Sequence, residues 1–328
     1  MQLIKELRKN DGQLNINDFV EDMDAYENAF KSLYKNKEYG LLYKVLKNIV
    51  DDYKKETQHA ISSYSPGMDF IVPYYTLYLY AIMTEKGIKG VVEKNKEESI
   101  GAYLTLLKRI DRVPSDMRKH LLKKSNLLLR HAYPDLMDLY SVALNYVGEN
   151  YFNKKDYKTA FKFFKKGADF DCDGRQITYP YYLIGINQDK VGDMYRDGHG
   201  VEKNRKLAIK YYKKCAENCC REYHPKIGDF ELEDKRYPLA FIYYTETNPR
   251  FRYFTGFLEP DNLAEKFNEI FKGINAIPDA KKQELDWTVL AMMYYAGLGC
   301  DKDENKFREL LPPDNKWAEN WIQKYVER

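Results

Sequence analysis

A cluster of thiols and one imidazole lies beyond the middle of the chain. Cys215 and Cys219 are four residues apart, so they would share one face of a helix, and Cys220 and His224 follow closely. Thiolates and imidazole are ligands that zinc prefers, but the cluster lacks the two separated ligand pairs of a structural zinc site. Three interpretations therefore stay open: zinc binding, a redox-responsive pair, and packing of the thiols as small apolar groups. We favour packing.

A run of carboxylates precedes this cluster. Asp169, Asp171, Asp173 and Gly174 reproduce the first half of a calcium loop, in which alternating carboxylates converge and glycine permits a sharp turn. The twelfth position of such a loop supplies a bidentate glutamate, but Pro180 stands there. The alternative interpretation is a connection whose aspartates cap helix ends. Calcium binding is thus a hypothesis, and no resident metal or cofactor is predicted.

A third candidate, His199, lies between Gly198 and Gly200. Two glycines at this spacing are typical of a tight turn with positive φ. They do not form a phosphate-binding loop, because no Lys-Ser/Thr pair follows them. The chain is predicted not to be an enzyme, because its histidines fall in no recognisable catalytic motif (His59, His120, His131, His199, His224).

Composition limits the classes of partner. The 328 residues carry a net charge of +3, from 53 basic and 50 acidic side chains. So balanced a surface gives no electrostatic reason to expect nucleic acid or an anionic membrane as the main partner. No apolar run reaches the roughly 18–20 residues that span a bilayer, and the first residues show no apolar secretion signal. Five cysteines, an odd number, do not form a disulfide framework, so we expect a cytoplasmic protein without membrane insertion.

Internal repetition accounts for the glycine turn. Residues 191–204 align without gaps to residues 290–303, and the histidine of the first copy is replaced by Leu298 in the second. The identical pairs are Met194/Met293, Tyr195/Tyr294, Gly198/Gly297, Gly200/Gly299 and Lys203/Lys302. A looser copy at residues 80–95 shares Met83, Gly87 and Lys94. A residue that is not retained between copies is not a required ligand of the motif.

A second pattern consists of a small residue, two spacers and two aromatics. It occurs at Ala160 with Phe163 and Phe164, at Ala208 with Tyr211 and Tyr212, and at Ala240 with Tyr243 and Tyr244. Small residues let two helices approach closely, and aromatics fill the space between one helical hairpin and the next. Together with the glycine turns, this spacing predicts stacked helical hairpins.

The unit from Val191 to Ala216 resembles a Sel-one-like repeat. That pattern begins Leu-Gly-x-Met-Tyr, continues Gly-x-Gly-Val-x-Lys-Asp, and ends Ala-x-x-Trp-Tyr-x-Lys-Ala-Ala. The matching residues are Val191, Gly192, Met194, Tyr195, Gly198, Gly200, Val201, Lys203, Asn204, Ala208, Tyr211, Tyr212, Lys214, Cys215 and Ala216. The units around Ala160 and Ala240 look more similar to the related tetratricopeptide repeat. The resemblance covers about two-thirds of the chain and implies an all-α fold, a right-handed α-solenoid of about five to seven stacked helical hairpins.

The resemblance also implies a function, since the family consists mostly of adaptors for protein complexes. We expect a scaffold that binds a protein or peptide partner on its concave face, at variable positions of the first helices: Asp193, Arg196, Met292 and Tyr295. One alternative is a metal-responsive regulator, which uses calcium or zinc at the sites above. A second alternative is an enzyme with an unrecognised site.

Three continuous regions are expected. Residues 1–60 form an N-terminal helical region with a degenerate repeat, residues 61–257 hold the central repeats, and residues 258–328 hold a C-terminal segment and the final repeat. The sequence leaves open whether residues 258–282 form a degenerate repeat or an inserted helix.

Overall fold

The computed structural model describes residues 2–13, 23–55, 71–112, 136–169, 179–218, 225–245, 262–311 and 315–325. Within these ranges the secondary structure is helical, apart from one isolated bridge between Ile88 and Val92. The chain divides into two compact units. The first comprises Met1–Phe170 with His199–Val201, and the second comprises Asp171–Gly198 with Glu202–Arg328.

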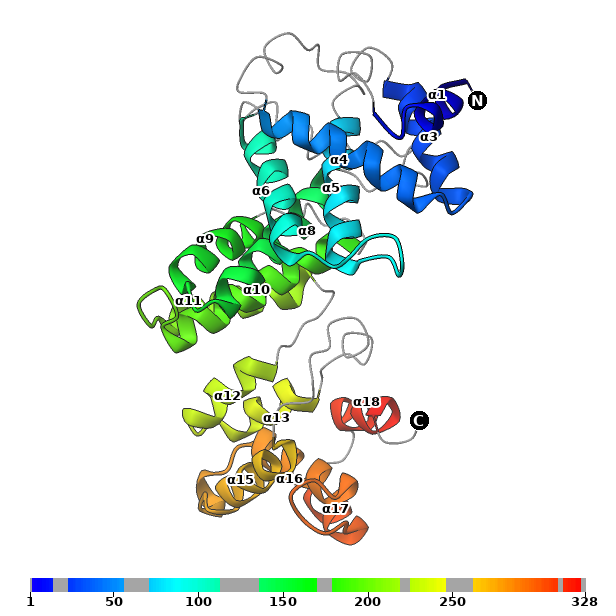
Figure 1. Cartoon of the computed structure of the whole chain (residues 1–328). Coiled ribbons are helices and arrows are strands. Elements are labelled where there is room, and N and C mark those ends of the chain that lie inside the picture. The colour runs from blue at the N-terminus through cyan, green and yellow to red at the C-terminus, as the bar shows by residue number, and fades with distance from the viewer. Residues whose placement is uncertain are drawn as a thin grey trace. The chain divides into compact units, whose positions relative to one another are not determined.

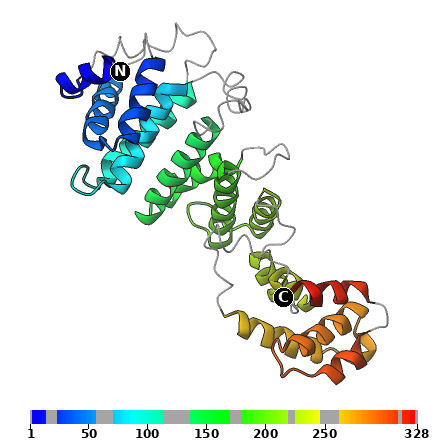
Figure 2. The same cartoon turned by 90° about the vertical axis from the view of Figure 1, so that its right-hand side faces the viewer.

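The first unit contains seven described helices. They are α1 (Gln2–Lys9), α3 (Met23–Lys35), α4 (Tyr39–Lys55), α5 (Ile71–Lys86), α6 (Lys96–Arg112), α8 (Leu136–Asn153) and α9 (Tyr157–Ala168). The pairs α3–α4, α5–α6 and α8–α9 are hairpins, and α5 and α6 lie side by side in both views (Figures 1 and 2). The tyrosine-rich stretch Tyr74–Met83 lies in α5. Its Leu77, Tyr80 and Ala81 have no exposed surface.

The second unit contains eight described α-helices and one short 3₁₀ helix. They are α10 (Tyr179–Asp197), α11 (Arg205–Asn218), α12 (Pro225–Glu233), α13 (Tyr237–Thr245), α15 (Leu263–Asn275), η2 (Asp279–Lys281), α16 (Glu284–Ala296), α17 (Glu304–Leu310) and α18 (Lys316–Tyr325). The pairs α10–α11, α12–α13 and α16–α17 are hairpins. Helix α15 lies within residues 258–282 and buries Phe267, Ile270 and Ile274 in the core shared with α13 and α16.

The small and aromatic positions pack as the sequence predicts. Ala160, Ala208 and Ala240 are fully buried. The second aromatic of each pair lies against a glycine of the preceding helix. A Cβ added at Gly148 would lie 2.7 Å from the ring of Phe164, and one at Gly192 would lie 2.4 Å from the ring of Tyr212. Gly228 and Tyr244 repeat this relation at 2.7 Å. In each of these three hairpins, one aromatic ring packs directly on a glycine.

The three glycine turns share one hydrogen-bonding scheme. Each ends at a residue that caps the second helix: Asn95, Asn204 and Asp303. The backbone N–H of each capping residue donates to a carbonyl of the first helix, at 2.9 Å to Thr84, 2.8 Å to Tyr195 and 3.0 Å to Tyr294. Their side chains accept from the backbone at the start of α6, α11 and α17. The looser copy near Met83 is therefore a real third copy of the turn.

Three other hairpins use a shorter turn without glycine. The turns between α3 and α4, α8 and α9, and α12 and α13 each place a lysine in the left-handed region, at Lys37, Lys155 and Lys235, with φ of 61°, 62° and 57°. The described hairpins therefore include two kinds, one with a glycine turn and one with a short turn that has a left-handed lysine. The predicted class, an all-α solenoid of stacked helical hairpins, is confirmed. The three-region division stays a prediction.

Candidate functional site

The predicted contact residues Asp193 and Arg196 lie together on α10. Arg196 Nη1 is 3.4 Å from Asp193 Oδ1, and Arg196 also binds Asp197 through two hydrogen bonds of 2.8 and 2.9 Å. Their side chains keep about a quarter to a third of their surface exposed, at 26% for Asp193 and 35% for Arg196. The hydrogen bond with Asp197 raises the pKa of Arg196, which stays charged. The structure thus brings these two predicted residues into one charged cluster.

Lys226, at the start of α12, completes this cluster. Its Nζ donates to both oxygens of Asp189 at 2.8 Å and to Asp193 at 2.7 and 2.8 Å. Burial by itself would lower the pKa of Lys226, but the negative charges of Asp189 and Asp193 outweigh it, and the pKa is raised. The Tyr212 hydroxyl donates to Asp193 at 2.8 Å, and the Lys226 ammonium lies 5.5 Å from the centre of the Tyr212 ring. One aspartate therefore joins α10, α11 and α12.

The same tyrosine–carboxylate–lysine arrangement recurs along the chain. In the second unit, Tyr244 donates to Asp229 at 2.8 Å, and Lys266 of α15 pairs with the same aspartate. In the first unit, Asp111 accepts from Tyr140 and Lys166, and Glu98 accepts from Tyr80 and Lys47. In the second-unit instances the aspartate directly follows the glycine that receives the tyrosine ring. We call each of these sets a hairpin clasp. In each clasp, one carboxylate accepts from a tyrosine and from a lysine that lie on two other helices.

The clasps are built for cohesion, since each charge already has an opposite partner. Burial raises the pKa of Tyr212, Tyr244 and Tyr80, so these phenols stay neutral at ordinary pH. Neither a neutral phenol nor a protonated lysine is an activated nucleophile. The arrangement positions helices.

The other two predicted contact residues differ from each other. Met292 is fully buried in the core of α13, α15 and α16, so its side chain offers no surface to a partner. Helix phase turns this position inward, although its counterpart Asp193 keeps some exposure. Tyr295 is partly exposed and packs on Phe307 with ring centres 4.8 Å apart. Lys302 Nζ lies 5.2 Å from the centre of the Tyr295 ring.

His199 packs as an aromatic group. Its ring stacks on Tyr157 at 4.4 Å between centres and meets the edge of Phe152 at 5.8 Å. A Cβ added at the neighbouring Gly200 would lie 2.4 Å from the carbonyl oxygen of Tyr157. The turn is therefore in close contact with the start of α9, and Gly200 and the flat ring of His199 both fit there.

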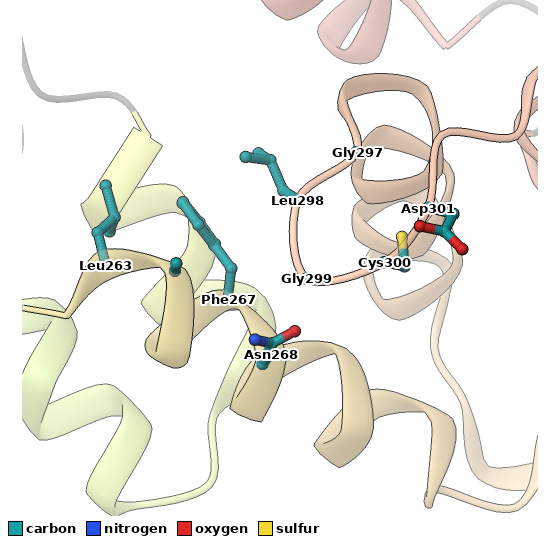
Figure 3. A pocket seen from close by; sticks show the side chains of 9 residues that line it. Leu263, Phe267, Asn268, Gly297, Leu298, Gly299, Cys300 and Asp301 are labelled. Atoms are coloured by element: carbon teal, nitrogen blue, oxygen red, sulfur yellow. The ribbon is translucent and has the colours of Figure 1, made fainter.

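A pocket opens at the corresponding turn of the last hairpin, within the second unit (Figure 3). Its volume is about 670 Å³, and it is lined by Leu263, Ala264, Phe267 and Asn268 of α15 and by Gly297–Asp301 of the turn. Leu298 extends from the turn toward Leu263 and Phe267, while Asp301 lies at the opposite end (Figure 3). No pattern in the sequence singled out α15 as a pocket wall. The glycine pair at Gly297 and Gly299 gave the only indication.

The thiols and carboxylates are accounted for only in part. Cys215 is fully buried in a small-residue position, as the packing interpretation requires. Asp169 pairs with Lys165 one turn earlier on the same helix. Cys219, Cys220 and His224, like Asp171, Asp173 and Gly174, lie outside the described residues. In the ranges the structure describes, no three His, Cys, Asp or Glu side chains are grouped to hold a metal ion. Zinc and calcium binding therefore stay hypotheses.

Helical hairpins recur along the chain, and they share the glycine–aromatic contact or the glycine turn. This recurrence defines a helical-repeat protein. The Sel1 repeat pattern matches residues 75–101, 141–169, 188–218 and 289–306. These stretches fall on the hairpins α5–α6, α8–α9, α10–α11 and α16–α17, and the chain contains Sel1 repeats there. The match at 141–169 includes Ala160, so this unit is a Sel1 repeat as well, although its short turn had suggested a tetratricopeptide repeat.

Solved structures similar to this chain include a Sel1 repeat protein from Oxalobacter formigenes. That structure is 16% identical, covers 91% of this chain and 84% of its own, and has a TM-score of 0.38. A protective antigen of uropathogenic Escherichia coli strains with an SLR fold is 14% identical, covers 94% of this chain and 70% of its own, and has a TM-score of 0.20. At these scores the likeness carries no argument about function. No curated protein sequence matches the chain at a significant level. Among the described residues, no helix has the length and apolar character needed to cross a membrane.

Proposed function

We propose that this chain is a scaffold that binds a protein or peptide partner through the first helices of its hairpins. Sel1 repeats are commonly protein-interaction scaffolds. The observation that carries the proposal is the partly exposed cluster of Asp193, Arg196 and Asp197 at the end of α10, in a hairpin whose packing positions are otherwise filled by buried side chains. Charged side chains that are held in place lose little entropy on binding, so they suit recognition of a polar partner.

Tyr295 supports the same assignment in the last hairpin. It occupies the position of Arg196 in the aligned repeat and is also partly exposed. An aromatic residue that is already held by Phe307 and Lys302 is a suitable anchor for a partner surface. Met292 is not part of the proposed surface, because it is buried.

Site-specific photo-cross-linking tests the proposal. A benzoyl-phenylalanine probe is placed at Tyr295 and at Arg196 on first helices, and at Leu239 and Lys210 on second helices as controls. Leu239 is 39% exposed, and Lys210 is exposed on α11. Discrete adducts should form from Tyr295 and Arg196, and the captured partner, once purified, should bind the unmodified chain directly.

The controls decide the outcome. If the second-helix probes capture the same partner with equal yield, the first-helix surface is wrong. If no purified partner binds the unmodified chain, the scaffold function itself is not supported.

A further inference from the structure

The two best copies of the glycine turn meet the preceding helix in the same way. The added Cβ of Gly200 would lie 2.4 Å from the carbonyl oxygen of Tyr157, and that of Gly299 would lie 2.4 Å from the carbonyl oxygen of Phe267. Tyr157 and Phe267 are therefore equivalent positions in the two junctions. This equivalence allows the surroundings of the two turns to be compared residue by residue.

The first junction is closed by aromatic rings. His199 stacks on Tyr157 and is flanked by Phe152 from the end of α8. In the second junction the residue between the glycines is Leu298, which has no flat ring to cover the helix. The result there is the pocket of about 670 Å³, within the range of about 300–1,000 Å³ that is usual for ligand pockets.

One wall of this pocket includes a helical turn that the first junction lacks. Tyr157 is the first residue of α9, whereas α15 begins one turn before Phe267, at Leu263. Leu263 and Ala264 of that extra turn line the pocket with Phe267 and Leu298. The exposed amide of Asn268 lies on the same wall and can donate to or accept from a peptide backbone.

The charge at the other end of the pocket is negative. Asp301 is exposed and lines the pocket, and Asp303 follows as the cap of α17. Burial, with the charges of Asp301 and Asp303, raises the pKa of the Cys300 thiol to about 11, so both carboxylates act on the pocket wall. The nearby cation Lys302 is held over the Tyr295 ring. An occupant with a positive charge next to an apolar group complements this arrangement.

We propose that this pocket binds a peptide segment of the partner, placing one large apolar side chain between Leu263, Phe267 and Leu298 and an adjacent lysine or arginine at Asp301. The proposal rests on the scaffold function and specifies the chemistry of one part of the partner. The helical wall and the glycine turn are rigid elements, so the apolar side chain enters a preformed space.

Labelled hexapeptide pools test this proposal on the full chain. One pool has leucine or phenylalanine followed by arginine at fixed central positions, and the other has glutamate in place of arginine. Fluorescence anisotropy measures the binding of each pool. The arginine pool should bind about threefold or more tighter, the size expected for one exposed ion pair.

Three variants locate the binding. Ala264→Phe fills the pocket from an exposed helix position, and Leu298→Trp fills it from the turn; either should weaken binding of the arginine pool about tenfold. Asp301→Asn should leave binding but remove the preference for arginine. Glu309→Gln, an exposed acid on α17 outside the pocket, is the matched control and should change neither.

Each contrary result overturns the proposal. These results are failure of the arginine pool to bind the wild-type chain, an unchanged affinity in Ala264→Phe, and a preserved arginine preference in Asp301→Asn. Such results leave the scaffold function standing if Tyr295 and Arg196 still cross-link a partner. If instead no purified partner binds the unmodified chain while peptide binding is intact, the scaffold function is not supported.

Discussion

Gly192 lies directly beneath the ring of Tyr212, and a Cβ at this position would lie 2.4 Å from the ring carbon Cε1. We predict that Gly192→Ala destabilises the second unit by about 1–3 kcal/mol, because the fully buried ring has no free space into which to move. Urea denaturation followed by circular dichroism measures the change.

Gly101→Ala is the matched control for this substitution. Gly101 also lies inside a helix, but nothing approaches within 4 Å of an added Cβ there. Helix propensity alone then acts, and the variant should be unchanged or more stable by about 0.5–1 kcal/mol. Equal destabilisation by the two alanines would mean that the glycine–tyrosine contact has no special role.

The clasp of Lys226 gives the second prediction. Lys226→Met removes the cation from Asp189, whose side chain is only 2% exposed, and the buried negative charge should cost about 3–5 kcal/mol of unfolding free energy. Adding Asp189→Asn should recover part of this loss by removing the charge. Lys210→Met, at an exposed position of α11, should lie within about 0.5 kcal/mol of the wild type.

Denaturant titration of the three variants decides this point. If Lys226→Met is as stable as Lys210→Met, the clasp does not hold α10 and α12 together. The prediction is specific to the charge, because methionine keeps most of the apolar length of the lysine side chain.

The sequence predicted the hairpins because their packing is local and repeats at fixed spacing. Ala208, Tyr212 and Gly200 could be assigned from their positions in aligned copies, and the structure buries or turns them accordingly. The short turns at Lys37 and Lys155 were not predicted in detail, since lysine carries no preference for positive φ.

The clasps and the pocket could not be predicted in the same way. Lys226 and Lys266 come from the next helix after the hairpin, α12 and α15 respectively, at a distance along the chain that varies from one clasp to the next. Met292 was misplaced because a helix that is apolar on every side gives no phase from sequence alone.

The buried tyrosines predict a loss of stability in alkali. The pKa of Tyr212 is raised by burial and by the charge of Asp193, so in the native state it keeps its proton above the ordinary pKa of about 10. The unfolded chain then binds fewer protons than the native chain, and the free energy of unfolding falls as pH rises above about 10. Lys226 acts in the same direction, because its raised pKa stabilises the fold below about pH 10.4 and this contribution is lost as pH rises through the native value.

Tyr212→Phe isolates the contribution of one phenol. It removes the hydrogen bond to Asp193 at neutral pH, which should cost about 1.5–3 kcal/mol. Above pH 10 the gap to the wild type should narrow by up to about 1.4 kcal/mol per pH unit, since one fewer tyrosine ionises on unfolding. Urea titrations at several pH values between 8 and 11 measure this; a gap that stays constant would contradict the buried, neutral phenol.

The glycine turn allows backbone strain to be separated from crowding. Gly200 and Gly90 have nearly the same φ, 73° and 74°, but an added Cβ meets the Tyr157 carbonyl at 2.4 Å in the first and nothing within 4 Å in the second. Gly90→Ala should therefore cost only the left-handed strain, about 1–2 kcal/mol. Gly200→Ala should cost that strain plus about 1–3 kcal/mol for displacing the turn from α9. Urea denaturation of both variants in the full chain, followed by circular dichroism, gives the difference directly. The two sites share their φ. A difference near zero would therefore show that the second glycine of the turn serves only to allow the left-handed backbone, and that the close approach to Tyr157 adds nothing to stability.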